Sequence, residues 1–519
     1  MKVNTISLNS VRLNTIALNH IGEIRSGGGG SKPSPIPQWI REHISFYYDM
    51  SKPMDVYPDD FGKWTKSTDS TSTVTSTNIT ITNLKAEKVS SVYIGKGGNF
   101  KGMKIRVSGL VDGQELYWGY WNNSLLRIPS NGDYTLSPIE QAVDNLGIRS
   151  GNIVGDCNIT IEMLPSGKSV PTNEILKVSG YLQDLSGRKR NMKLNNFLFA
   201  EMSGVGGYNT NFSKWVIISS MGTVDRISSE QIIIRNVVNP GGGLVNMSLT
   251  NGRVFLKCNI TGITEELKGK IVFRYASKES YFKNKILDNG YFEFDSDIES
   301  KGEGWAGFTS TEPIDNCNIT ITQIPEYPGA LVTDGVDDYG LVENLSSGVK
   351  MLFMTVNPMM LDRCLYDQRF TSGWHLFAVI TSSDKIAYNN YNTKGKTYIN
   401  GVLNESQTSN ELQNKKQIIT AINQDVNETN SLSPFFFKIR LGGLYMKCAF
   451  YNSIAFDSIP TEADGFTEQE LIDYVLTNII DNEIYNRYDR MADPTWIVGF
   501  ADNAKQRRCN QSSAARRIR

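Results

Sequence analysis

Short runs of alternating apolar and polar residues follow one another along most of the chain and are separated by glycine-rich turns. In one such run, Ile159 and Ile161 fall on one side of an extended segment, and Asn158 and Thr160 fall on the other. A two-residue period of this kind is typical of antiparallel strands with one face in a core and one face in solvent. The pattern therefore predicts many short strands.

Helical spacing is scarce by comparison. We expect a short helix at 137–146 and a longer one at 467–480, where Leu471, Val475 and Ile479 fall on one stripe. The two patterns together predict an all-β chain of tandem β-sandwich or jelly-roll modules with one C-terminal helix.

The middle of the chain contains an internal repeat. The sequence CNITIEMLP at 157–165 returns as CNITITQIP at 317–325, with six of nine positions identical. Two further matches occur in the same order: KIRVSGL at 104–110 with KCNITGI at 257–263, and FGKW at 61–64 with FSKW at 212–215. We therefore expect two homologous β-sandwich modules. Module one is predicted at 38–170 and module two at 171–328, and they begin near the motifs YDMS at 48–51 and QDLS at 183–186.

The first 25 residues have a period of five. We expect a short β-solenoid-like docking arm at 1–25, with these apolar residues on one side: Ile6, Leu8, Val11, Leu13, Ile16 and Leu18. The stretch loosely resembles pentapeptide repeats, although its bulky Val and Ile residues depart from that pattern. One turn of such a coil cannot bury its own apolar side, so another chain is expected to cover it. Glycines and prolines at 26–37 predict a linker between the arm and the body.

A different set of motifs begins near residue 329. A turn with the sequence DGVDDYG at 334–340, a buried strand WHLFAVI at 374–380 and a hairpin YINGVL at 398–403 precede the long helix. This ordered set resembles the laminin-G or concanavalin A-like jelly roll. The resemblance implies a lectin-like module at 329–482, followed by a basic C-terminal tail at 483–519.

Other stretches resemble viral proteins. The sequences YLQDLSG at 181–187, NNFLF at 195–199 and GVGGY at 204–208 are similar to segments of tailed-phage fibre and spike proteins, notably of the crAss-like phages that infect gut Bacteroidales. The resemblance implies a virion protein that is assembled in the host cytoplasm, is exposed on the particle surface and has other virion proteins as partners. Because fibres are commonly trimers, it also implies a homotrimer.

Composition and charge exclude several classes of protein. Lys and Arg number 53 and Asp and Glu 54, for a formal net charge of -1, so no general attraction to nucleic acid or to anionic membranes is expected. No stretch of about 18 apolar residues is present, so membrane insertion is not expected, and Asn and Ser interrupt the N-terminal residues where a secretory signal needs an apolar core. Six cysteines without C-x-x-C spacing predict free, mostly buried thiols.

Two groups of residues are candidates for ligand binding. Aromatic residues can form platforms for the apolar faces of sugars, or can simply be core or turn residues; the candidates are Tyr117, Trp118, Tyr120, Trp121, Tyr388 and Tyr391. Asp334, Asp337 and Asp338 supply hard oxygen ligands for calcium, although they would serve equally well as turn caps. No other cofactor is expected.

Catalytic patterns are weak. The string EFDSDIE at 293–299 resembles the active-site strand of concanavalin-like glycosidases in part and would place four carboxylates on one face: Glu293, Asp295, Asp297 and Glu299. Its register departs from that pattern, because position 298 is Ile and the corresponding stretch of module one has no carboxylate, so a solvated face is favoured. No nucleophile–base motif and no phosphate-binding loop is present, and we expect no enzyme.

The basic tail is a candidate docking segment. Contact with an acidic patch on another virion protein is favoured over nucleic-acid binding for Arg507, Arg508, Arg516 and Arg517. The sequence thus predicts a head or tail fibre subunit that docks to the particle through its arm and binds host surface glycans through lectin-like modules. The alternatives are a purely architectural virion component that binds no sugar and a glycan-degrading tail spike.

Overall fold

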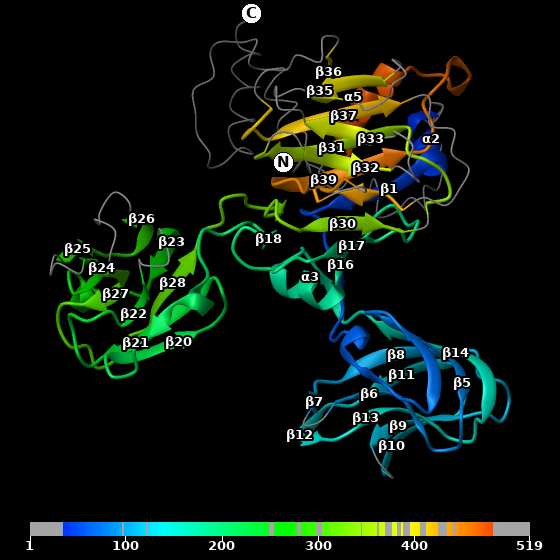
Figure 1. Ribbon diagram of the computed structural model, residues 1–519, viewed down its shortest axis with the longest axis horizontal. Coiled ribbons are helices and arrows are strands. Elements are labelled where there is room, and N and C mark those ends of the chain that lie inside the picture. The colour runs from blue at the N-terminus through cyan, green and yellow to red at the C-terminus, as the bar shows by residue number, and fades with distance from the viewer. Residues whose placement is uncertain are drawn as a thin grey trace, which may run out of the picture.

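The chain forms three β-sandwiches, which appear as separate bodies in Figure 1. It is all-β, as the alternating pattern predicted. The computed structural model describes residues 35–95, 98–120, 123–248, 254–277, 282–296, 304–343, 345–360, 363–368, 376–380, 386–387, 395–404, 412–423, 433–439 and 443–480. The predicted docking residues of the arm and the tail lie outside these ranges: Ile6, Leu8, Val11, Leu13, Ile16, Leu18, Arg507, Arg508, Arg516 and Arg517.

Module one packs two five-stranded antiparallel sheets around one core, with strand orders β10-β9-β13-β6-β3 and β11-β8-β14-β5-β4. Alternate residues of each strand enter the core; on β8, Met103, Ile105 and Val107 are buried between exposed neighbours. A smaller sheet joins β7 and β12. The strands are β3 (Thr65–Lys66), β4 (Ser70–Val74), β5 (Asn78–Leu84), β6 (Ser90–Ile94), β7 (Gly98–Phe100), β8 (Met103–Ser108), β9 (Leu116–Tyr120), β10 (Asn123–Ile128), β11 (Gly132–Leu136), β12 (Ile139–Val143), β13 (Leu146–Ser150) and β14 (Gly155–Leu164).

Module two repeats the two five-stranded sheets of module one strand for strand. Its sheets have the orders β19-β22-β27-β24-β25 and β20-β21-β28-β23-β26, so each strand has a counterpart in module one at the same place in its sheet. The repeat in the sequence is therefore a repeat of the fold. The strands are β19 (Val216–Ile217), β20 (Gly222–Arg226), β21 (Gln231–Val237), β22 (Val245–Ser248), β23 (Phe255–Thr261), β24 (Ile271–Ser277), β25 (Phe282–Ile286), β26 (Gly290–Asp295), β27 (Gly304–Ser310) and β28 (Ile319–Gln323).

The repeated motifs form matching local structures. FGKW and FSKW give the 3-10 helices η1 (Phe61–Lys63) and η2 (Phe212–Lys214), each capped by the preceding Asp or Asn side chain. Gly109 and Gly262 both have a positive φ, and a Cβ there would lie 1.9 Å from the Asn158 carbonyl oxygen or 2.1 Å from that of Asn318, respectively. Only glycine fits at either place.

The third body, which we call the large sandwich, has two bigger antiparallel sheets. Their orders are β18-β29-β39-β31-β37-β35-β36, with β1 also paired to β39, and β16-β17-β30-β38-β32-β33-β34. The predicted turn at Asn400 and Gly401 is present, because both have positive φ and β35 pairs with β36 across them. The strands are β1 (Ile44–Asp49), β16 (Tyr181–Leu182), β17 (Met192–Asn195), β18 (Gly204–Val205), β29 (Leu331–Val332), β30 (Tyr339–Val342), β31 (Met351–Pro358), β32 (Arg363–Asp367), β33 (Leu376–Ile380), β34 (Ile386–Ala387), β35 (Gly395–Ile399), β36 (Val402–Leu403), β37 (Gln417–Asn423), β38 (Phe435–Phe436) and β39 (Cys448–Phe456).

The large sandwich is discontinuous in sequence, which differs from the module boundaries expected at 38, 171 and 329. Strands β1 and β16–β18 belong to it, and Phe46, Tyr48 and Leu182 lie in its core. Module one is thus inserted between β1 and β16, and module two between β18 and β29 (Figure 1). The YDMS motif begins in β1, and Asp184 of the QDLS motif accepts a hydrogen bond from the Tyr47 amide of β1 at 2.9 Å. Both motifs therefore lie in the large sandwich and do not begin the modules.

Each inserted module leaves and re-enters the large sandwich through two adjacent chain segments, which we call its root. In root one, β2 (Met54–Val56) pairs with β15 (Gly167–Ser169). In root two, the amides of Glu326 and Tyr327 each donate at 2.8 Å, to the carbonyl oxygens of Gly207 and Gly206 respectively. The modules therefore have their first and last residues side by side.

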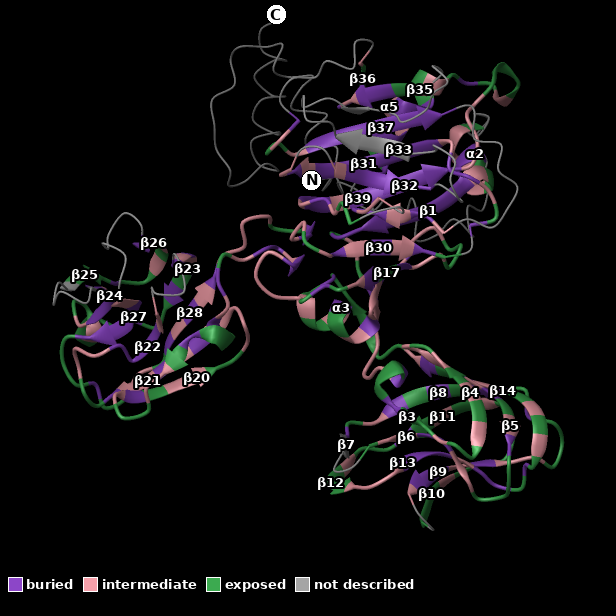
Figure 2. Cartoon of the chain, in the orientation of Figure 1, coloured by how far each residue is buried: buried purple, intermediate pink, exposed green. Residues whose placement is uncertain are grey.

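The described α-helices, α2 (Pro35–His43), α3 (Asn173–Ser179) and α5 (Glu468–Asn478), all belong to segments of the large sandwich. The long helix predicted at 467–480 is α5. Helix α2 begins in the last residues of the linker expected at 26–37 and continues into residues that were expected to begin module one. Residues of α2 and α5 pack together on the outer side of the eight-stranded sheet, whose central strands are largely buried (Figure 2). The prediction of a helix at 137–146 is wrong, because strand β12 occupies that stretch and pairs with β7. No helix of the described residues is long and apolar enough to cross a membrane.

Candidate functional site

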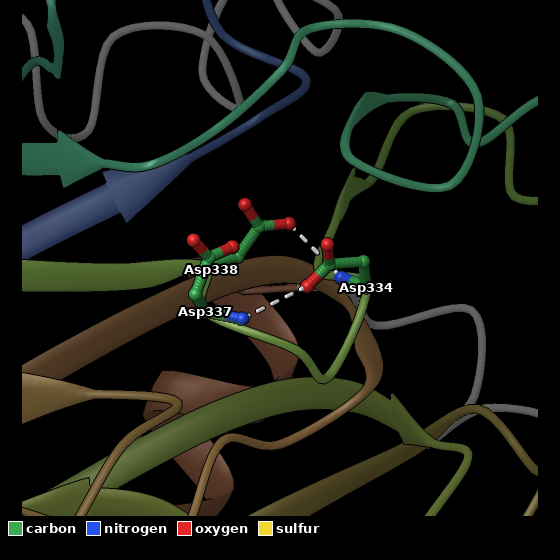
Figure 3. Close-up of side chains that lie close together, drawn as sticks. All are labelled: Asp334, Asp337 and Asp338. Carbon is green, nitrogen blue, oxygen red and sulfur yellow. Dashed lines mark hydrogen bonds between the residues drawn. The ribbon is translucent and has the colours of Figure 1, made fainter. Parts of the chain in front are cut away.

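The three predicted calcium ligands meet in the turn between β29 and β30 of the large sandwich (Figure 3). One carboxylate oxygen from each of Asp334, Asp337 and Asp338 lies within 4.8 Å of the other two. Asp338 is fully buried, whereas Asp337 is not. The structure thus brings together the residues on which the calcium prediction depends.

These carboxylates already accept hydrogen bonds from the protein. Asp338 accepts one from the Ser203 hydroxyl at 3.0 Å and one from the Asp334 amide at 2.9 Å, and Asp334 accepts one from the Val336 amide at 2.7 Å. Burial raises the pKa of Asp338 to about 7, and the two hydrogen bonds oppose this only in part. The turn is therefore capped by its own donors, and a calcium ion would also have to ionise Asp338.

The aromatic residues predicted as a sugar platform lie on opposite sides of β9. Trp118 is fully buried and packs against Trp64 and Phe100 in the core of module one, with ring centroids 5.8 and 4.8 Å apart. Tyr120 lies half-buried against the same core, so neither residue belongs to a platform. Tyr117 is on the outer face. Three more predicted residues lie outside the described ones: Trp121, Tyr388 and Tyr391.

Tyr117 belongs to the outer face of the sheet β10-β9-β13-β6-β3, which we call the module-one face. Its cross-strand neighbours are Arg127 on β10 and Arg149 on β13. In the next row, Tyr93 on β6 lies opposite Gly147, which itself lies opposite a second glycine on β9. The face therefore presents two half-buried tyrosines, two arginines and a row of positions without side chains.

A hydrogen-bond network fixes Tyr117 on this face. Its hydroxyl donates to one oxygen of Glu115 at 2.7 Å, and the Arg127 Nε donates to the other oxygen. The Tyr117 hydroxyl and then the Arg127 guanidinium lower the pKa of Glu115, and the hydrogen bond to Glu115 raises the pKa of Tyr117. A neutral phenol thus stays against an ionised carboxylate at neutral pH. The sequence signal for this pair was the Glu two positions before a Tyr, because such residues share one face of a strand.

Module two lacks the equivalent face. Val272, Ile286 and Asn246 occupy the positions of the β9 tyrosine, the β10 arginine and the β6 tyrosine. Arg274 takes the place of the β9 glycine and donates to the carbonyl oxygen of Gly241 in a glycine-rich loop. The loop lies against this face of module two, so the two modules share a fold but differ at this surface.

The described part of the glycosidase-like string shows a single exposed carboxylate. Glu293 on β26 accepts a hydrogen bond from the Tyr291 hydroxyl at 2.9 Å and lies opposite Lys257 on β23. Asp295, at the end of the strand, is buried. Asp297 and Glu299 lie outside the described residues. The exposed carboxylate of this string, Glu293, is thus a solvated group that is hydrogen-bonded to Tyr291.

Five described cysteines are free thiols, as expected. Cys258 and Cys448 are fully buried, and burial raises the pKa of each to about 12. These thiols are core residues.

No protein-family model and no curated protein matches the chain. Among solved structures, the chain is similar to the N-terminal CBM22-1-CBM22-2 tandem domain of Xyn10C from Paenibacillus barcinonensis, with 10% identity and a TM-score of 0.14. That match covers 48% of this chain and 97% of the other. A similarity at this level implies neither a fold nor a ligand for this chain.

Proposed function

We propose that this chain is an adhesive, non-enzymatic structural protein of a tailed-phage particle, a head or tail fibre subunit that binds host surface glycans. The observation that carries the proposal is the module-one face, where two tyrosines lie beside a fixed network of charged groups. Sugar-binding surfaces combine aromatic rings for the apolar sugar faces with a few placed polar groups for the hydroxyls. The loss of these residues in module two supports a specific role for module one.

The architecture supports a role for the large sandwich as a scaffold that holds module one where a glycan can reach it. Each module joins the large sandwich at its root, and module two also contacts it through the Lys214–Glu201 ion pair at 2.6 Å and the hydrogen bond from Asn173 to Glu230 at 3.4 Å. In the described part of the chain, the two five-stranded sheets of each module pair with no strand of the large sandwich. In this proposal the 1–25 arm docks to other virion proteins and joins copies into a homotrimer, and several weak sites then act together. Light scattering on the full chain and on a chain beginning at residue 31 tests the arm. We expect a trimer and a monomer, respectively, and two monomers would contradict self-assembly.

Glycan binding is tested with the purified full chain on an array of bacterial surface glycans, followed by calorimetric titration of the glycan that binds. We expect Tyr117→Ala to weaken binding about tenfold or more, because the ring supplies the apolar contact. Tyr291→Ala is a matched control, since Tyr291 is also a partly exposed tyrosine that donates to an acid two residues away, but in module two. Equal effects of the two substitutions would contradict the role of the module-one face.

The same experiment separates the alternatives. A chain that binds no glycan on the array supports a purely architectural component. Release of new reducing ends from a glycan, with loss of release in Glu293→Gln, supports a glycan-degrading spike.

A further inference from the structure

We infer that the module-one face selects glycans that carry a carboxylate, such as those built from uronic acids, and that Arg149 is the residue that recognises it. The inference rests on the proposed glycan binding and adds the class of sugar.

Arg149 has few partners for a guanidinium. Its Nη2 donates to the carbonyl oxygen of Lys88 at 2.6 Å, and its buried Nε has no hydrogen-bond partner. No salt bridge to Arg149 is present within the described part of the chain, whereas Arg127 on the same face is paired with Glu115. The face therefore carries two guanidinium groups and one carboxylate, which leaves one positive charge uncompensated.

Partial burial makes this charge costly. Arg149 is half-buried, and burial lowers its pKa without an acidic neighbour to oppose the effect. A desolvated charge without a counter-charge is unfavourable, and an anion that arrives with a ligand relieves it. The corresponding module-two position is Thr309, which is fully buried.

The position of Arg149 suits one particular anion. Arg149 and Tyr117 are directly opposite each other on β13 and β9, so their Cβ atoms are about 5 Å apart. One hexuronic acid can therefore place its ring against Tyr117 while its carboxylate reaches Arg149. A planar guanidinium binds a planar carboxylate through two parallel hydrogen bonds, which a neutral hydroxymethyl group cannot replace.

The experiment compares uronic-acid-rich bacterial capsular polysaccharides with the same polysaccharides after reduction of their carboxyl groups to hydroxymethyl groups. We expect the full chain to bind the native forms about tenfold more tightly. Arg149→Gln should reduce this ratio to near one, and Arg149→Lys should restore part of the ratio. Arg106→Gln is the control, because Arg106 lies on the other sheet of module one and is paired with Asp133.

Each outcome has a distinct meaning. Equal binding of native and reduced forms, or a ratio that Arg149→Gln does not change, overturns the inference while glycan binding stands. Binding to neither form, when another glycan on the array does bind, also overturns the inference alone, whereas binding to no glycan at all contradicts the proposed function itself. Circular dichroism and the thermal transition of module one check that the variants are folded. A sulfated polysaccharide that binds as tightly as the native uronic acids would show recognition of any anion and would also overturn selection of carboxylates.

Discussion

The backbone of one residue decides where several aromatic side chains lie at the end of β38. Phe437 has a φ of 64°, in the left-handed region that bulky residues rarely adopt. The alternation of the strand is interrupted there, so Phe436 and Phe437 are both fully buried while Phe435 stays half-buried. The next residue is Lys438, whose Nζ lies 4.2 Å from the ring centroid of Tyr339. Burial of two rings offsets a backbone cost of about 1–3 kcal/mol.

Two equivalent glycines allow the modules to be destabilised separately. A Cβ on Gly147 would lie 2.2 Å from the Val92 carbonyl oxygen, and one on Gly307 would lie 2.3 Å from that of Val245. We expect Gly147→Ala and Gly307→Ala each to lower the free energy of unfolding of its own module by about 3 kcal/mol, because a strand must move.

Differential scanning calorimetry of the full chain measures this effect. Gly167→Ala is the control, since a Cβ there meets nothing within 4 Å. The cores of the two modules share no residue, so a shift of every transition by either variant would contradict their independence.

Asp338 gives the large sandwich a defined dependence on pH. Its pKa is about 7 in the folded chain and 3.8 in the reference state, so the folded chain holds the proton more tightly. Protonated Asp338 therefore contributes its full stabilisation of the folded chain below about pH 4, and this contribution is lost as the pH rises to about 7. The free energy of unfolding falls by at most about 4 kcal/mol over this range. We expect Asp338→Asn to flatten this dependence and to be the more stable form at pH 8, measured by denaturant unfolding.

Calcium is tested on the same turn. Because the Asp334 and Asp338 oxygens already accept protein hydrogen bonds, we expect millimolar calcium at pH 8 to move the thermal midpoint by no more than about 1 °C. A rise of several degrees that a chelator reverses, and that Asp338→Asn removes, would show that the turn binds calcium.

At the scale of elements, α5 begins with a capping box. Thr467 accepts from the Glu470 amide at 3.2 Å, and Glu470 accepts from the Thr467 amide at 2.7 Å. We expect Thr467→Ala to destabilise the large sandwich by about 1 kcal/mol at pH 7. Hydrogen bonds from the Thr467 amide and hydroxyl to the Glu470 carboxylate lower the pKa of Glu470, so the difference in stability should shrink as acid protonates it. Gln469→Ala, on the same exposed turn, is the control for denaturant unfolding.

Local sequence patterns correctly predicted the elements whose formation depends on residues close together in the sequence. The hairpin at Asn400 and Gly401 and the stripe of α5 follow from turn chemistry and from helical spacing. The pairing of β1 with β39 joins residues some four hundred positions apart and leaves no local trace. The tyrosines of the candidate site show the same limit. Alternation separates Tyr117 from Trp118, but only packing decides which side is the core, and only strand register places Tyr93 on the same face as Tyr117.

For the whole molecule, the insertions mean that the large sandwich should fold without them. Val56 is paired with Gly167, and Gly207 is hydrogen-bonded to Glu326, so each module can be replaced by a short turn across its root. We expect a chain lacking 57–166 and 209–325 to keep one cooperative transition in calorimetry and the near-ultraviolet circular dichroism of a packed core. Loss of that transition would show that the modules are needed to hold the three segments of the large sandwich together.

The side-by-side roots also determine how the molecule carries mechanical load. Tension applied between residues 35 and 480 runs through β1, β39 and α5, all of which belong to the large sandwich. The first and last residues of each module are tied to each other, so the stretched path passes by both modules. Tension of this kind therefore leaves both modules folded until the large sandwich itself unfolds.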